Sequence, residues 1–484
     1  MSSFIGTAVF LSLLLAGSLQ STSGERFESF DKDPGWEGIN NRSRQPRQRT
    51  VKQDFGYQAT THFGGQPGEI GGFVSTAAEP AYYAKRIPTK TLSDSLTASG
   101  RLIYTGKGPH LLLGFFNADT INEWRTPNSL SIRVQGRGEV FYAYVEYCTS
   151  KWRAGGDSPG GFAIVPDAKS GKKQLKGFRI GQVYSWSMKY DPAGNQGCGS
   201  MSVTIDGETS VCHLSNGHKS DGATFNRFGM LAVSKSADGG GEVWLDEITI
   251  NGKKENFSVD PGWDAAGNRR TYETSNVRPW FDFGYSPTHH AQGKAPGELG
   301  GLVFRGDCRY ADRMAAYGDR LEQLDLTRPL KASGRVVLRR GVTDSTTLLG
   351  YYHSKDSLEV NKSQASGIPR SFLGIAIEGP SREGFLLYPI YRLHGDQQGY
   401  AKGDDRPHIL PDGRVHDWSL VYQPGSEGKS ARVIVKLDGH PVHLDLKPDQ
   451  TRFDRFGLIT TWIDGNGQQI YFDDLRYTAS QGVR

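Results

Sequence analysis

An internal repeat constrains this chain more than any other feature. The stretch DPGWEGINNR begins at Asp33, and DPGWDAAGNR begins at Asp260. Further pairs follow in the same order, among them LTASGRL and LKASGRV, VTIDG and VKLDG, and FNRFGMLAV and FDRFGLITT. Because order and spacing both hold, the sequence predicts one domain written twice, over residues 25–252 and 253–480.

Within each copy, apolar and polar residues alternate over short segments. In SLSIRVQG, Leu130, Ile132 and Val134 fall on one face of a strand, and RVIVKLDG alternates in the same way. The 62 Gly and 23 Pro supply frequent turns between such segments. We therefore expect an all-β protein of two tandem antiparallel β-sandwich domains, each a jelly roll larger than an immunoglobulin domain.

The amino terminus predicts export. Residues 4–16 form an apolar run followed by small residues, as in a secretory signal peptide, which we assign to residues 1–24. No Lys or Arg precedes the run, so an unusual leader or a lipid-independent anchor is the alternative. No later segment approaches a membrane span. The mature chain is expected to be secreted, periplasmic or on the cell surface.

Charge and cysteine content narrow the partners. The net charge of +5 is small for 57 basic and 52 acidic residues, and the basic residues are spread along the chain, which argues against nucleic acid. No phosphate loop, HExxH motif or zinc-type Cys spacing occurs, and no organic cofactor is expected. Cys198 and Cys212 flank a predicted hairpin with its turn at Asp206 and Gly207, which predicts a disulfide. The pairing of Cys148 and Cys308 stays open.

The end of each copy carries a family resemblance. The series WSLVY, VKLDG, FDRFGL and YFDDLRY resembles the carboxy-terminal half of concanavalin A-like lectin/glucanase (laminin-G-like) jelly rolls. The earlier half resembles secreted proteins of marine, planctomycete-like bacteria. The resemblance implies the jelly-roll fold, which hosts lectins, glycoside hydrolases, polysaccharide lyases and adhesion modules.

The same resemblance implies a structural calcium ion. Asp246 and Asp473 occupy the place where such jelly rolls often hold calcium between first and last strands, and Asp33 and Asp260 are candidate second ligands. The glucanases of the family carry Glu-x-Asp-x-Glu on one strand. The nearest string here, EVWLDE at residues 242–247, has different spacing and does not favour that chemistry.

Polar and aromatic residues gather on predicted strands of copy one. Aromatic planes and Arg side chains suit stacking on sugars and binding of carboxylate or sulfate groups. The alternative is an ordinary sandwich surface with core aromatics. The predicted substrate-binding residues in copy one are Asn117, Trp124, Arg125, Arg133, Arg137, Tyr142, Tyr144, Glu146 and Trp152.

Copy two has a corresponding but diverged cluster, in which Arg370, Glu378 and Arg382 are predicted to bind substrate. The predicted catalytic residues are His353, Tyr388, Tyr391 and Arg392. Such a set could perform β-elimination on a uronic acid, because Arg neutralises the carboxylate while His or Tyr removes the α-proton and Tyr protonates the leaving oxygen. Alternatively, His353 is a structural hydrogen-bonding residue. His62 and His290, each followed by Glu69 or Glu298, either complete a site or hold a loop.

These observations predict a secreted protein that binds, and cleaves by β-elimination or hydrolysis, an acidic or sulfated polysaccharide. One alternative is a non-catalytic carbohydrate-binding or adhesion protein of the cell surface, in which two linked sites raise the affinity. Another is a structural protein of the cell envelope. The oligomeric state is left open.

Overall fold

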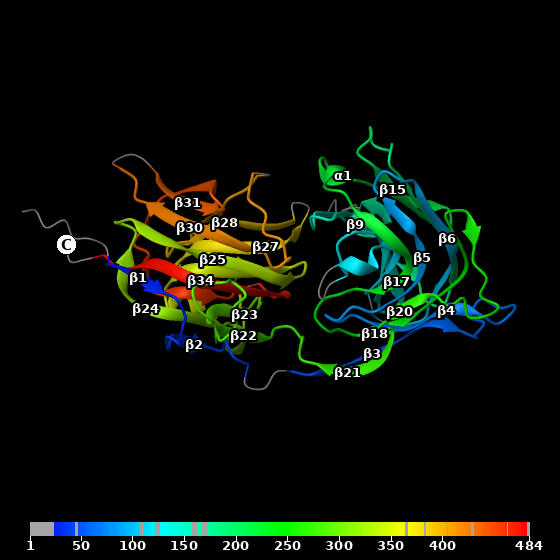
Figure 1. The fold of residues 1–484 in the computed structure, drawn as a ribbon, viewed down its shortest axis with the longest axis horizontal. Coiled ribbons are helices and arrows are strands. Elements are labelled where there is room, and N and C mark those ends of the chain that lie inside the picture. The colour runs from blue at the N-terminus through cyan, green and yellow to red at the C-terminus, as the bar shows by residue number, and fades with distance from the viewer. Residues whose placement is uncertain are drawn as a thin grey trace, which may run out of the picture.

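Four large antiparallel sheets and one of two strands form two lobes in the computed structural model of this protein (Figure 1). The jelly-roll β-sandwich predicted for each half is confirmed. The predicted signal peptide at residues 1–24 lies almost entirely outside the described residues. The structure describes residues 24–43, 47–106, 108, 110–121, 126–156, 162–166, 173–363, 366–381, 384–403, 405–426, 430–461 and 463–481.

Lobe one contains two large sheets. Sheet 1A runs in the spatial order β16 (Glu208–His213), β15 (Ser200–Ile205), β14 (Val183–Asp191), β6 (Leu96–Tyr104), β18 (Gly240–Ile250), β4 (Glu69–Ser75), β3 (Arg49–Gln58) and β21 (Arg269–Thr274), with β19 (Lys253–Lys254) on β18. Sheet 1B runs in the order β10 (Ala154–Gly156), β9 (Val140–Cys148), β8 (Ser129–Arg137), β7 (His110–Phe116), β17 (Thr224–Ala232), β5 (Tyr82–Thr91) and β20 (Asp264–Ala266), with β13 (Phe178–Arg179) on β9. The smaller elements are β11 (Ala163–Pro166), β12 (Lys173–Leu175), η1 (Ala118–Thr120) and α1 (His218–Asp221).

Lobe two has the same two-sheet plan. Sheet 2A runs in the order β22 (Phe281–Ser286), β23 (Glu298–Phe304), β34 (Gly467–Ser480), β25 (Leu330–Gly341), β30 (Val415–Gln423), β31 (Ala431–Leu437) and β32 (His440–Leu446), with β1 (Gly24–Glu28) on β34. Sheet 2B runs in the order β2 (Glu37–Ile39), β24 (Ala316–Asp325), β33 (Arg452–Ile459), β26 (Ser345–Tyr352), β27 (Phe372–Ser381), β28 (Gly384–Arg392) and β29 (Gln398–Tyr400). Two short 3-10 turns, η2 (Ala311–Arg313) and η3 (Asp356–Leu358), connect strands.

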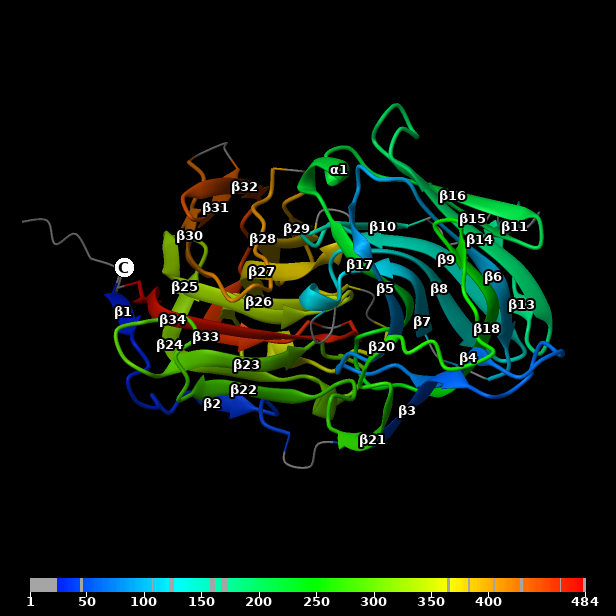
Figure 2. The ribbon, with the colours of Figure 1, turned by 45° about the vertical axis from the view of Figure 1, so that its right-hand side comes forward.

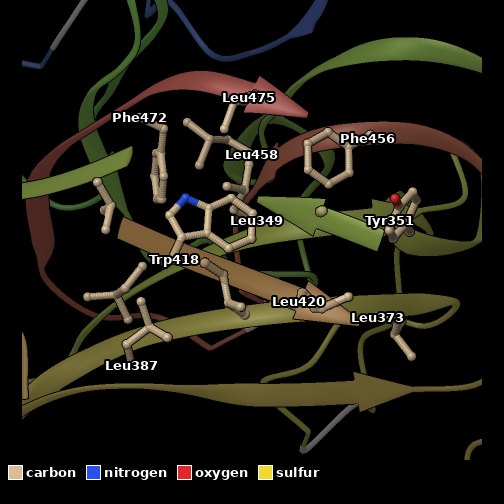
Figure 3. Close-up of a cluster of buried hydrophobic side chains, with 14 of the residues drawn as sticks. Leu349, Tyr351, Leu373, Leu387, Trp418, Leu420, Phe456, Leu458, Phe472 and Leu475 are labelled. Atoms are coloured by element: carbon tan, nitrogen blue, oxygen red, sulfur yellow. The ribbon is translucent and has the colours of Figure 1, made fainter. Parts of the chain in front are cut away.

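Each core lies between the two sheets of its lobe, because alternate residues of the strands point inward. Along β30, Trp418, Leu420 and Tyr422 are buried, whereas the intervening residues are more exposed. Trp418 packs against Phe472 of β34, with ring centroids 6.3 Å apart, and leucines of sheet 2B close the other side (Figure 3). The two-residue periodicity read from the sequence is therefore the one that builds the core.

The lobes do not begin where the sequence repeats begin. Strands β1 and β2, at the start of the first copy, pair with β34 and β24 of lobe two. Strands β20 and β21, at the start of the second copy, pair with β5 and β3 of lobe one. The predicted divisions 25–252 and 253–480 thus follow the repeat, whereas strand pairing assigns the head of each copy to the other lobe (Figure 1). Sequence similarity does not show this exchange, because the two heads resemble each other and each directly precedes its own copy in the chain.

The two DPGW segments make equivalent turns in opposite lobes. The Asp33 carboxylate accepts a hydrogen bond from Gly35 N at 2.9 Å, and the Asp260 carboxylate accepts one from Gly262 N at 2.9 Å. Trp36 packs on Phe30 and on Tyr317 of lobe two, with centroids 5.2 and 5.8 Å away. Trp36 therefore anchors the head of the first copy in the core of lobe two.

Trp263 makes the equivalent contacts in lobe one. It packs on Tyr83 and Phe257, with centroids 5.7 and 5.6 Å away. Both of these partners are buried in the lobe-one core. The head of the second copy is therefore held in lobe one by the same kind of aromatic contact that holds the first head in lobe two.

The predicted disulfide between Cys198 and Cys212 does not form in this structure. Strand β15 begins at Ser200, so Cys198 lies in the preceding turn, and its Sγ is 3.8 Å from Asn216 Oδ1. Met201 is the residue opposite Cys212 in the ladder. Cys212 itself is buried in the lobe-one core. The predicted hairpin is present, but its first strand begins two residues after Cys198.

The lobes pack directly on each other. Trp152, which follows β9, is buried in the core cluster of lobe two, 5.8 Å from the ring of Phe385. Nearby, β10 of lobe one contacts β27 of lobe two (Figure 2). Ser236 Oγ donates a buried hydrogen bond of 2.9 Å to Asn466 Oδ1 across the same boundary. These contacts hold sheets 1B and 2B next to each other.

Within the part of the chain that the structure describes, no helix is long and apolar enough to cross a membrane.

The exchanged segments generate a stability prediction. We expect Trp36→Ala to destabilise lobe two and Trp263→Ala to destabilise lobe one, each by about 3–5 kcal/mol, because each removes a buried aromatic side chain. Hydrogen exchange followed by mass spectrometry should show faster exchange in β24, β33 and β34 for the first variant, and in β3, β5 and β17 for the second. The opposite assignment of exchange to lobes would contradict the strand pairing.

Candidate functional site

A pocket of about 660 Å³ lies on the outer face of sheet 2B. Even-numbered residues of β26, β27 and β28 point to this face, because their odd-numbered neighbours fill the core between the sheets. Leu348, Tyr388 and Ile390 form part of an apolar floor. Residues 366–368, Thr461 and Ile463 form walls. The size suits a sugar ring or two with their substituents.

Arg305 and Glu378 form the polar centre of the pocket. Arg305 Nη2 lies 3.0 Å from Glu378 Oε1, and Arg305 Nε donates to Thr346 Oγ1 at 2.9 Å. Glu378 also accepts a short hydrogen bond from the Tyr388 hydroxyl. Because the Glu378 side chain remains 43% exposed, this carboxylate can reach a ligand.

Two further cations surround the aromatic residues of the pocket. The ammonium of Lys402 lies 5.2 Å from the ring centroid of Tyr400, and the guanidinium of Arg406 lies 5.2 Å from that of Tyr388. Among the described residues, neither cation has a carboxylate within ion-pair distance. Arg305 and Lys402 line the pocket against one carboxylate, Glu378, so its lining carries net positive charge. Arg406 adds a third cation beside it, on the ring of Tyr388.

The rim of the pocket exposes apolar side chains. Tyr400 and Ile463 are each 45% exposed, although large hydrophobic residues are mostly buried elsewhere. The ring of Tyr400 stands 6.2 Å from that of Tyr388, which gives the pocket two aromatic surfaces. Exposed aromatic rings beside polar groups are suited to packing on the apolar face of a sugar.

Tyr388 is protonated in this environment. Burial, followed by the negative charge of Glu378 and the hydrogen bond to it, raises the pKa of Tyr388 well above its ordinary value. The phenol is therefore a hydrogen-bond and proton donor at neutral pH, not a base.

The structure does not assemble the four predicted catalytic residues. Tyr391 is one of the odd-numbered residues of β28, lies in the core and is 4% exposed. Arg392 shares the face of Tyr388, but its guanidinium is held by Asp396 at 2.8 Å and by the Ile368 carbonyl at 3.2 Å. Strand alternation excludes Tyr391 from the pocket, and local ion pairing occupies Arg392.

His353 lies away from Tyr388. Tyr388 is opposite Ala376, which is opposite Leu348, and His353 is five residues further along the chain, about 16 Å at the usual strand rise. His353 Nδ1 instead accepts a hydrogen bond from Asp356 N at 3.2 Å. His353 therefore closes the turn after β26, which was the structural alternative.

Lobe one has its own Arg, Glu and Tyr group on sheet 1B. Arg133 lies 2.9 Å from Glu146 and 4.4 Å from the ring centroid of Tyr144, so these three predicted residues are brought together. Tyr142 lies on the same face, and Arg137 is exposed at the end of β8. Arg133 and Glu146 are each about one quarter exposed, which leaves both accessible to a ligand.

Other predicted binding residues have structural roles. Asn117 caps η1 and bonds to Thr224 at 2.7 Å, and Trp152 is buried between the lobes. Arg370 pairs with Glu359 at 3.2 Å and Asp396 at 3.1 Å. Trp124, Arg125 and Arg382 lie outside the described residues.

The two predicted histidine loops are held by buried carboxylates. His62 Nδ1 lies 2.5 Å from Glu69 Oε1, and its ring stacks on Trp244 at 3.9 Å. In lobe two, Glu298 accepts hydrogen bonds from the backbone N–H groups of His290 and Ala291 at 3.0 and 2.7 Å. The first loop is thus held to sheet 1A of lobe one, and the second to sheet 2A, whereas the pocket lies on sheet 2B.

The four aspartates predicted as calcium ligands have separate environments. Asp33 and Asp260 bind the N–H groups of their own turns and lie within 3.4 Å of a tyrosine hydroxyl. Asp246 Oδ1 accepts from Glu247 N at 2.7 Å. Among the described residues, no group of three His, Cys, Asp or Glu side chains is placed to hold a metal.

Asp473 is the aspartate that best fits a cation. It is fully buried, and its Oδ2 atom has no hydrogen-bond partner among the described residues. Burial, together with the charges of Asp474 and Glu298, raises the pKa of Asp473 to about 7. One orphaned carboxylate oxygen is much less than the six to eight oxygens that calcium prefers, so backbone carbonyls would have to supply the rest.

Sequence reasoning missed most of the pocket. It identified Glu378 and Tyr388, but not Arg305, Tyr400, Lys402 or Ile463. Tyr400 and Lys402 lie in the segment DQQGYAKGDDR, where an aromatic and a cation alternate in a Gly- and Asp-rich stretch. This pairing of an aromatic residue with a cation could have indicated a binding loop. Arg305 and Ile463 come from distant parts of the chain, and no local pattern connects them with the pocket.

No known family model matches this chain, and no curated protein sequence matches it. Among solved structures it is similar to mouse laminin α1 domains LG4-5, with 11% identity, a TM-score of 0.22, and coverage of 91% of this chain and 94% of that one. It is also similar to the carbohydrate recognition domain of Emp47p, with 10% identity, a TM-score of 0.26, and coverage of 41% and 88%.

An alginate lyase from Pseudomonas aeruginosa is a third such structure, with 11% identity, a TM-score of 0.24, and coverage of 40% of this chain and 85% of the lyase. At these values a function cannot be transferred, so the functional argument rests on the residues of this chain.

Proposed function

We propose that this protein binds an acidic polysaccharide, and that the pocket on sheet 2B is the binding site. The observation that carries the proposal is the combination in one pocket of an exposed aromatic rim, a reachable carboxylate and two lining cations, with a third cation on the ring of Tyr388. A neutral sugar would need hydrogen-bonding partners but no surplus of positive charge. Lys402 and Arg406 have no anionic partner among the described residues. Carboxylate or sulfate groups on the sugar would supply that partner.

The pocket also has the open shape expected of a site that binds part of a polysaccharide chain. It is open to solvent at a rim made by Tyr400 and Ile463, so a polymer can pass across it. The predicted export of the protein, which stays a prediction, would place this site where extracellular polysaccharides occur.

Two substitutions test the binding proposal. We expect Tyr400→Ala and Lys402→Gln each to weaken binding of polygalacturonate about tenfold, equivalent to ~1.4 kcal/mol, because they remove a stacking surface and a cation. Isothermal titration calorimetry with polygalacturonate and with neutral dextran measures both affinity and charge preference. Lys436→Gln, an exposed lysine on β31, is the matched control and should bind like the wild type. Equal affinity for the two polymers would contradict the acidic ligand.

The contact between Tyr388 and Glu378 favours a second function, β-elimination at the same site. Glu378 would take the proton from the carbon next to the uronate carboxylate, and Tyr388 would protonate the leaving oxygen as the carbon–oxygen bond breaks and the carbon–carbon double bond forms. The proton would return from Glu378 to Tyr388 along their hydrogen bond. The cations Lys402 and Arg406 would stabilise the charge that develops on the carboxylate.

Hydrolysis is less well supported than elimination. It uses two carboxylates, and Glu378 is the only one lining the described pocket.

A pair of matched tyrosine variants tests cleavage. Absorbance of the unsaturated product should rise when wild-type protein is mixed with polyuronates, and Tyr388→Phe should lower the rate at least about a hundredfold, the usual contribution of a positioned proton donor. Tyr391→Phe makes the same chemical change on the same strand but in the core, and should keep its rate. No product from the wild-type protein would leave a binding protein without lyase activity.

We also propose that lobe two binds calcium at Asp473. Calcium should then raise the melting temperature by about 2–4 °C for each kcal/mol of binding free energy. Asp473→Asn should abolish the increase, because it removes the orphaned oxygen charge. Asp33→Asn should retain the increase, because that carboxylate serves its own turn. Differential scanning calorimetry with calcium and with a chelator is the measurement, and an increase that survives in Asp473→Asn would place the ion elsewhere.

A further inference from the structure

Lys235 occupies an unusual position at the boundary between the lobes. It lies in the loop between β17 and β18 of lobe one, is half-buried, and donates its backbone N–H to the Ala77 carbonyl at 2.9 Å. The described residues place no carboxylate within ion-pair distance of its ammonium. A half-buried cation without a partner is costly unless an anion can approach it.

The charges around Lys235 do not neutralise it. Its charged neighbours are Arg278, Asp238, Arg133 and Asp344. Asp238 is already paired with Arg49 at 3.1 Å, and Arg133 with Glu146 at 2.9 Å. This leaves Lys235 and Arg278 against Asp344, and therefore one surplus positive charge at the lobe boundary.

A short series of contacts connects Lys235 to the pocket of lobe two. The next residue, Ser236, donates a hydrogen bond to Asn466 at 2.9 Å. The carbonyl of Asn466 accepts a hydrogen bond from the backbone N–H of Arg305 at 3.2 Å, and Gly465 is packed against the Arg305 side chain. Arg305 is the cation at the centre of the pocket. Lys235 is thus two contacts away from the proposed binding site.

The same lysine is near the Arg, Glu and Tyr group of lobe one. Arg133 is close enough to Lys235 for their charges to interact. Glu146, the partner of Arg133, lies opposite Gly156 of β10 in the sheet, and β10 contacts β27, the strand that carries Glu378. The strands that carry the two polar groups therefore meet at the lobe boundary, and Lys235 lies near the lobe-one group.

From this arrangement we infer that the two lobes share one binding groove, in which Arg133, Lys235 and Arg305 contact successive acidic groups of a single polysaccharide chain. The inference rests on the proposed binding of acidic polysaccharide and extends that site across the lobe boundary. It assigns to Lys235 the role of a binding residue at the crossing point. It also explains why the lobes are fixed by Trp152 and by the Ser236–Asn466 hydrogen bond, since a groove across two bodies needs them held in register.

The groove has a pH dependence with a defined sign. Burial first, and then the positive charges of Arg278 and Arg133, lower the pKa of Lys235 to about 8, while Asp238 and Asp344 oppose the shift. A bound anion would raise this pKa, because it stabilises the charged form. Binding is therefore strongest when Lys235 is protonated, below about pH 8, and weakens as the pH rises through that value.

The test compares a long and a short probe on the same variants. Polygalacturonate can reach both lobes, whereas digalacturonate can occupy only the lobe-two pocket. We expect Lys235→Met to weaken binding of the polymer about tenfold, the loss of one charge-assisted contact, and to leave binding of the disaccharide unchanged. Lys235→Arg should restore most of the polymer affinity. The decrease in polymer affinity between about pH 7 and pH 9 should be smaller in Lys235→Met than in the wild type.

A measurement on the wild-type protein avoids dependence on folded variants. Acetylation of Lys235 by acetic anhydride, followed by mass spectrometry, should be slowed by the polymer and not by the disaccharide, while acetylation of Lys436 should be unaffected. The shared groove is wrong if Lys235→Met binds the polymer as tightly as the wild type and the polymer does not slow acetylation of Lys235. If Lys402→Gln still weakens binding in that case, the lobe-two site stands. If wild-type protein binds neither probe nor a sulfated dextran, the proposed function and the groove both fail.

Discussion

Backbone hydrogen bonds between the two ends of the chain complete lobe two. Strand β1 pairs with β34, the last strand, and its Arg26 reaches the carboxylate of Asp319 on the opposite sheet, which Tyr477 also contacts. Strand β2 then pairs with β24, so the amino-terminal segment ties together both sheets of that lobe. Because lobe two needs residues from both ends of the sequence, closing its core requires contacts between residues far apart in the chain, which cost loop-closure entropy.

The pairing of each copy's head with the other lobe also keeps the two lobes in contact. The chain crosses the boundary twice, once between β2 and β3 and once between β21 and β22, and each crossing is short. Trp152 then extends the core of lobe two with a side chain from lobe one. The hydrogen bonds from Ser236 and from Arg305 N–H to Asn466 bring the loop that carries Lys235 close to the segment that carries Arg305.

The chemistry of the site follows from strand alternation. On β28, Tyr388 faces the pocket and Tyr391 faces the core, although they lie only three residues apart and are the same residue type. From the sequence both were equivalent candidates. Burial of Tyr388 beside Glu378 leaves it a protonated donor, so of the two roles predicted for tyrosine, base and proton donor, only the second fits this side chain. His353, predicted as its partner, is distant along the strand because the ladder register separates them.

The sequence by itself determined the fold class, the repeat and the inward-facing residues, because a two-residue period and turn residues are local properties of the chain. It also identified Glu378, Tyr388 and the Arg133, Tyr144 and Glu146 group, since these lie on regular strands. Tertiary structure alone decided which lobe receives each DPGW segment, because two similar heads can pair with either core. It also decided that Arg305, Tyr400 and Lys402 line one pocket, since these residues are brought together by strand pairing and loops far apart in the sequence.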